Sequence, residues 1–118
     1  MDDIVWSYKN DDWIRQSDLV GYSVEARDGS IGTIDEASTE AARRWLVVDT
    51  GFWIFGKKRL IPAGTVAGVD HDSKLVVINM SKSAIKAAPD YDKETWGDEA
   101  QGEHAAYYDE YAARDDES

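Results

Sequence analysis

The chain has 118 residues, no cysteine and a formal net charge of −11 at neutral pH. This length allows one domain with a modest core, and the absence of cysteine excludes disulfide bonds, thiolate metal ligands and a cysteine nucleophile. The start of the chain is acidic and no apolar run approaches the roughly 20 residues that cross a bilayer, so we expect a cytoplasmic protein without a membrane span.

Charge is distributed unevenly along the chain. The first 18 residues carry a net charge of −3 and the last 31 carry −9, whereas the 69 residues between them carry +1. We therefore expect an N-terminal arm (residues 1–17), a nearly neutral central domain (18–92) and an acidic C-terminal tail (93–118). Acidic ends repel phosphate, which disfavours nucleic-acid binding by the whole chain.

The arm is polar apart from a few large apolar residues, among them Trp6, Trp13 and Ile14. Two of the five tryptophans of the chain lie here. We expect the arm to pack partly onto the central domain, because burying such side chains is favourable.

The central domain opens with a strand and a hairpin. Apolar and polar side chains alternate from Tyr22 to Ala26, which predicts a strand with one buried face. Asp28-Gly29 follows and predicts a two-residue turn of type I′, in which both central residues have positive φ. Gly32 in the returning strand predicts a bulge or a bend.

More strands and a helical turn follow the hairpin. Arg44–Thr50 is a largely apolar strand that we expect to be buried on both faces, and Thr65–Asp70 and Lys74–Met80 are further strands. Ser81 can cap a short helix that Pro89 stops. This order predicts an all-β barrel or sandwich rather than a βαβ fold.

The tail contains a linker-like stretch and a second helical segment. Residues 97–102 include two glycines, whereas residues 103–113 are rich in alanine and contain no helix breaker. Four ring-bearing residues at spacings of three and four would share one helical face; they are His104, Tyr107, Tyr108 and Tyr111. This face either packs the helix on its own domain or docks a partner.

Three segments, in this order, resemble the PRC-barrel family over residues 18–92. "DLVGYSVEARDGSIGTIDEAS" resembles its opening hairpin, "RWLVVDTGFWIFGKKRLIPAGTVAGVD" its middle strands, and "SKSAIKAAPDYD" its closing helix. The resemblance implies a small antiparallel PRC-type β-barrel of five to six short strands. A short C-terminal helix and an acidic tail, partly helical or disordered, would complete the chain.

The family includes the cytoplasmic domain of the photosynthetic reaction centre H subunit and the C-terminal domain of the ribosome maturation factor that assists small-subunit assembly. Its members are generally protein-binding modules and not enzymes. The H subunit carries a membrane-spanning helix before its barrel, and the ribosome factor carries an RNA-associated domain. Residues 1–17 can supply neither, so the resemblance implies an interaction module without either specific function.

The strongest candidate surface is the aromatic run of Phe52, Trp53, Ile54 and Phe55. In a strand, alternate side chains of this run point to opposite faces, and only one face can enter a small barrel. Either the ends of the chain cover the other face, or it forms an interface with a second copy or another protein, with Trp53 as the anchor. A membrane-surface role is a third alternative. We expect a homodimer formed through this hairpin, or a complex with another protein.

Five basic residues, Arg43, Arg44, Lys57, Lys58 and Arg59, could form a basic rim. A solvated face of the domain is the simpler interpretation. The alternative is a ribosome- or RNA-associated factor that uses this rim, with the acidic tail folding back to compete for it.

His71 lies between Asp70 and Asp72 and could be a metal ligand or a base. The same residues are typical of a polar turn, and His104 is the only other imidazole in the sequence. We therefore expect no metal, cofactor or catalytic residue and no enzyme activity. A small metal-binding protein or enzyme centred on His71 remains the alternative.

Overall fold

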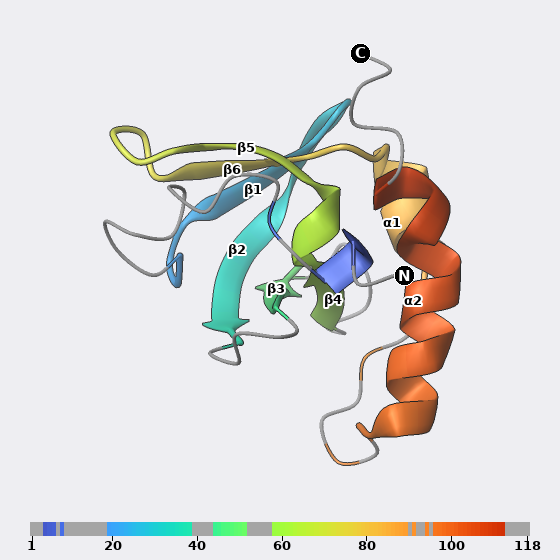
Figure 1. Cartoon of the computed structure of the whole chain (residues 1–118). Coiled ribbons are helices and arrows are strands. Elements are labelled where there is room, and N and C mark those ends of the chain that lie inside the picture. The colour runs from blue at the N-terminus through green and yellow to red at the C-terminus, as the bar shows by residue number, and fades with distance from the viewer. Residues whose placement is uncertain are drawn as a thin grey trace.

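The computed structural model describes residues 4–6, 8, 19–38, 44–51, 58–89, 91, 94 and 96–112. The chain is mostly β, with one six-stranded sheet and a long helix beside it (Figure 1). The elements, in chain order, are η1 (Ile4–Trp6), β1 (Ser23–Ala26), β2 (Gly29–Ala37), β3 (Trp45–Asp49), β4 (Lys58–Pro62), η3 (Ala63–Thr65), β5 (Val66–Asp70), β6 (Leu75–Ile78), α1 (Lys82–Lys86) and α2 (Asp98–Ala112).

The strands are ordered β4-β3-β2-β1-β6-β5 across the sheet. All neighbours are antiparallel except β1 and β6, which are parallel. The prediction of a wholly antiparallel sheet is therefore wrong for this pair. Its strands are joined through β2 to β5 instead of through a hairpin, and a long connection permits parallel pairing. The sheet is not closed, because β4 and β5 lie at its two ends, so a barrel is not confirmed.

The first hairpin forms as predicted, but its turn differs. Ala26 pairs with Gly29, so the two turn residues are Arg27 and Asp28, and neither has a positive φ. The prediction of a type I′ turn at Asp28-Gly29 is wrong. The carboxylate of Asp28 instead accepts a hydrogen bond of 2.8 Å from the backbone N–H of Lys82, one of the donors that a helix leaves unpaired at its first turn.

The bulge predicted at Gly32 is present. The register between β1 and β2 shifts at Val24 and Glu25, which leaves Ile31 without a partner in the ladder. Gly32 has a φ of +154°, and a Cβ atom there would lie 2.1 Å from the carbonyl oxygen of Asp49 on β3. The close approach of the β2 and β3 backbones therefore requires glycine.

The core is formed by the sheet and the helices. Both faces of β3 are buried, as predicted, because the consecutive residues Leu46, Val47 and Val48 are all 0% exposed. The strands supply side chains that are at most 1% exposed, including Val24, Ile34, Leu46, Val48, Leu60, Ile61, Val76 and Ile78. The arm also packs on this core, because Trp6 is only 5% exposed and its carbonyl oxygen accepts a 2.8 Å hydrogen bond from the N–H of Arg44. Packing of the arm is thus confirmed for Trp6, whereas Trp13 and Ile14 lie outside the described residues.

The structure confirms the predicted cap of α1 but not the predicted start of α2. Ser81 caps α1 through the N–H of Ala84, as predicted. Helix α2 begins at Asp98, so the interpretation of residues 97–102 as a linker is wrong, and Gly102 lies inside the helix.

The predicted ring-bearing face of α2 packs on the domain itself. His104 and Tyr108 are buried, and Tyr107 and Tyr111 are partly buried against the core. Within the described residues, no helix is long and apolar enough to cross a membrane.

Candidate functional site

The aromatic run of residues 52–55 lies outside the described residues, and so do Arg43 and Lys57. The structure does describe the two strands that this segment connects. Strand β3 ends at Asp49, β4 begins at Lys58, and these two residues are partners in the antiparallel register. The base of the β3–β4 connection is therefore defined, and β4 is the outermost strand at this end of the sheet.

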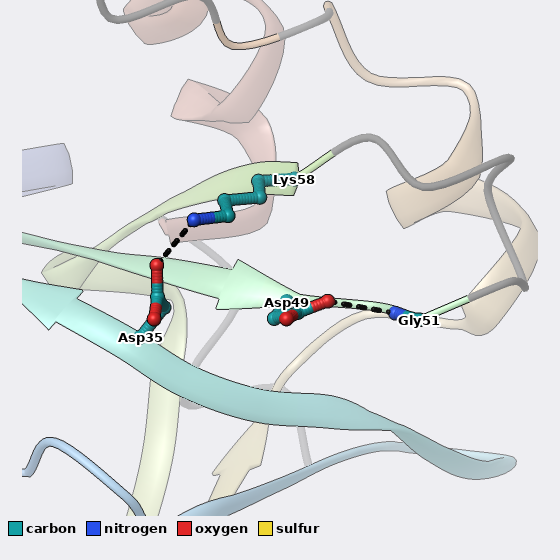
Figure 2. A network of polar contacts seen from close by, with 4 residues as sticks. All are labelled: Asp35, Asp49, Gly51 and Lys58. Atoms are coloured by element: carbon teal, nitrogen blue, oxygen red, sulfur yellow. Dashed lines mark hydrogen bonds and ion pairs between the residues drawn. The ribbon is translucent and has the colours of Figure 1, made fainter.

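Polar contacts fix this base on both strands (Figure 2). The ammonium group of Lys58 forms an ion pair with Asp35 of β2, and the carboxylate of Asp49 accepts a 2.9 Å hydrogen bond from the N–H of Gly51. Asp35 is the unpaired residue of a second bulge, between Ile34 and Glu36. The hydrogen bond to Asp35 raises the pKa of Lys58, and Asp49 and Glu36 add to this effect.

Arg59 follows Lys58 but points to the buried side of the sheet. Its guanidinium donates to the carbonyl oxygens of Ile85 at 3.2 Å and Lys86 at 2.8 Å, at the end of α1, with a longer contact of 3.5 Å to Pro89. The side chain is 3% exposed. A cation at the carbonyl end of a helix is favourable, so Arg59 joins the sheet edge to α1.

The described members of the expected basic rim therefore have separate surroundings. Lys58 is paired with Asp35 on the exposed side of the sheet, and Arg59 is buried against α1. Arg44 lies near Tyr8, and its charge partly opposes the effect of burial, which raises the pKa of Tyr8 to about 12. The structure does not gather these three cations into one patch.

His71 lies in the turn between β5 and β6 and contacts the core. Its Nδ1 atom and the hydroxyl of Tyr22 are 2.7 Å apart, and the two rings meet edge to face. Asp70 accepts hydrogen bonds from Ser73 and from the N–H of Asp72, and the bonds from Ser73 are the main reason that its pKa is lowered. Among the described residues, no three His, Cys, Asp or Glu side chains are grouped to hold a metal ion. These contacts are those of a polar turn that is joined to Tyr22, the residue before β1.

A pocket of about 300 Å³ lies where η1 meets α2; the described residues that line it are Trp6, Asp98, Gln101, Gly102 and Ala105. The pocket is not predicted from the sequence, because residues 97–102 resemble a linker. A helix that begins at Asp98 places the four lining residues of α2 on one face, because the other three follow Asp98 by three, four and seven positions.

The aromatic rings behind the pocket form a continuous series. Centroid distances are 5.8 Å from Trp6 to Trp45, 5.4 Å from Trp45 to Trp96 and 5.1 Å from Trp96 to His104. Rings at these separations attract one another and are held in place by packing. The Trp6 wall of the pocket is therefore part of the core.

Tyr108 marks the buried end of this series. It stacks on His104 and is 0% exposed, and burial raises the pKa of its hydroxyl, which the charge of Arg59 partly opposes. In the part of the chain that the structure describes, no atom is placed to form a hydrogen bond with this hydroxyl.

Comparisons with known proteins give limited information. No protein-family model matches the chain, and no curated protein matches its sequence. Among solved structures, the chain is similar to the 16S ribosomal RNA processing protein RimM from Pseudomonas aeruginosa, with 20% identity and a TM-score of 0.46. The similarity covers 55% of this chain and 42% of that one. The chain thus spans less than half of the length of that protein, and a similarity of this extent assigns no function.

Proposed function

We propose that this chain is a non-enzymatic protein-interaction module of the PRC-barrel type, which presents residues 52–55 to a second copy of itself or to another protein. The resemblance of residues 18–92 to that family motivates the fold type. The observation that carries the proposal is the fixed base of the β3–β4 connection.

That base fixes the two strand ends that flank residues 52–57. The pairing of Asp49 with Lys58, the ion pair from Lys58 to Asp35, and the hydrogen bond from Gly51 to Asp49 all lie within a few residues of the aromatic run (Figure 2). A binding segment that is held at its ends loses less conformational entropy when it binds. Aromatic side chains are also the most common anchors of protein interfaces.

Three of the described ionisable groups support a binding role over catalysis. Arg59 binds the end of α1, His71 is joined to Tyr22, and Lys58 is paired with Asp35. Each of these groups therefore has a structural role, whereas catalysis needs a set of such groups directed at one point.

Light scattering on the full chain tests self-association. We expect a dimer that becomes a monomer in Trp53→Ala and persists in Val20→Ala. Val20 is the control because its apolar side chain is 48% exposed and it lies in a different part of the sequence. A partner protein would instead be captured from the native cell by the wild type and the control, and lost with Trp53→Ala. A monomeric wild type that captures the same proteins as Trp53→Ala would contradict the proposal.

The alternative of a ribosome- or RNA-associated factor rests on the basic rim. Because Lys58 and Arg59 are engaged on opposite sides of β4, the described residues give it no support. Strong, salt-dependent binding of RNA to the full chain would favour this alternative instead.

A further inference from the structure

The pocket between η1 and α2 has one rigid wall and one polar wall. Trp6 forms the rigid wall: it is 5% exposed, contacts Trp45 edge to face, and has its carbonyl oxygen bonded to the N–H of Arg44. The α2 stripe that begins with Asp98 and Gln101 forms the other wall. An edge of the aromatic core, a carboxylate and an amide thus line one space.

Gly102 leaves part of this space open. It lies inside α2, where glycine lowers helix stability relative to alanine. At Gly32 a Cβ atom would meet backbone, but a Cβ atom at Gly102 would have no atom within 4 Å, and its φ is not in the left-handed region. Neither the backbone nor crowding requires glycine here. What its missing side chain leaves open is the pocket.

The charge around the pocket selects a cation. Asp98 lines it, and Glu99 and Glu103 are exposed on the same helix. No basic residue is among the described lining residues, and the chain as a whole carries −11. A guanidinium group is planar and donates several hydrogen bonds at once to carboxylate and amide oxygens.

We propose that this pocket binds an arginine side chain from a basic segment of a partner protein. The volume of about 300 Å³ is at the lower end of the range for ligand pockets, as a single side chain requires. Glu99 and Glu103 would attract further basic residues of the same segment. This proposal does not depend on the role of residues 52–55.

An NMR titration of the labelled full chain tests the proposal with acetyl-Gly-Arg-Gly-amide as the probe. We expect the indole N–H of Trp6 and the amide of Gly102 to shift, with a dissociation constant of roughly millimolar size for so small a ligand. The citrulline analogue, which lacks the charge, should give no shift. Equal shifts with both peptides, or none with arginine, would overturn the proposal.

Matched variants distinguish specific binding in the pocket from general electrostatic attraction to the acidic chain. Asp98→Asn and Glu99→Gln each remove one negative charge from the first turn of α2, but only Asp98 lines the pocket. We expect Asp98→Asn to weaken binding about threefold or more and Glu99→Gln to have a smaller effect. Gly102→Leu should fill the pocket, keep the fold and abolish binding. Equal losses in the two charge variants, or normal binding by Gly102→Leu, would assign the effect to bulk charge and refute the site.

The source of the arginine is tested by peptide length. A Lys-Lys-Arg-Lys-Lys peptide should bind more tightly than the tripeptide, and free arginine more weakly than either. Tighter binding of free arginine would contradict a protein partner. Repeating the titration with Trp53→Ala should leave the result unchanged, so the failure of either proposal is distinguishable.

Discussion

The hydroxyl of Tyr107 donates a 2.6 Å hydrogen bond to the carbonyl oxygen of Ala84 and so joins α2 to α1. The next residue, Tyr108, has the opposite situation. Its ring is fully buried, and its hydroxyl has no hydrogen-bond partner among the described residues. Two adjacent tyrosines therefore attach the same helix in different ways, one through its hydroxyl and the other through its ring.

We expect removal of these two hydroxyls to have opposite effects. Tyr107→Phe should lower the free energy of unfolding by about 1 kcal/mol, because it leaves the Ala84 carbonyl without this donor. Tyr108→Phe should leave that free energy unchanged or raise it, because a buried unpaired hydroxyl is unfavourable. Urea denaturation of both variants measures the difference. A greater loss in Tyr108→Phe would show that its hydroxyl has a partner.

Substitution of the two adjacent cations on β4 should also have unequal effects on the free energy of unfolding. Arg59→Met should lower the free energy of unfolding by about 2–4 kcal/mol, because it removes charged donors from the carbonyl oxygens at the end of α1. Lys58→Met is the control: Lys58 and Asp35 have side chains that are 42% and 40% exposed, and such pairs contribute about 0.5 kcal/mol or less. Thermal and urea unfolding would measure both. Similar losses in the two variants would contradict a structural role for Arg59.

Two glycines of the sheet provide a test of the β2–β3 contact. Gly32→Ala should lower the free energy of unfolding by about 3 kcal/mol or more, because its Cβ would clash with the Asp49 carbonyl and its φ is positive. At Gly68 an added Cβ atom would meet open space, and the φ angle is not positive, so Gly68→Ala should be neutral or slightly stabilising. Thermal denaturation compares the two, and a stable Gly32→Ala would mean that β2 and β3 can separate locally at little cost.

Local patterns predicted the parts of the fold that depend on neighbouring residues. Alternation identified β1, the serine signal identified the cap of α1, and the spacing of tyrosines identified the buried face of α2. Each of these features is decided within about one turn or one strand, so the sequence alone contains the information.

Features that depend on distant residues were not predicted. Asp28 resembles a turn residue, yet its carboxylate bonds to Lys82, which is 54 positions away. Nothing in the basic run distinguishes Arg59 from Lys58 until the sheet directs one inward. The pocket was missed for a different reason: glycine lowers helix stability, yet α2 continues through Gly102 where it packs on the domain.

The partly buried tyrosine of the arm, Tyr8, predicts a loss of stability at alkaline pH. Burial disfavours the phenolate and raises the pKa of Tyr8 from its ordinary value of 10.0 to about 12 in the fold. The neutral form is thus favoured by folding, so its contribution is complete below pH 10 and is lost as the pH rises toward 12. One pKa unit corresponds to about 1.4 kcal/mol, so Tyr8 should account for roughly 1 kcal/mol of the loss between pH 9 and pH 11.

Urea denaturation at pH 9 and pH 11 measures this loss in the wild type and in Tyr8→Phe. The comparison uses the change with pH within each protein, so any constant effect of removing the hydroxyl cancels. We expect the decrease to be smaller in Tyr8→Phe, although not absent, because burial also raises the pKa of Tyr108. Charge repulsion within this acidic chain is the same in both proteins. Equal decreases would mean that Tyr8 ionises as readily in the fold as in the unfolded chain, and that the arm does not shield it from water.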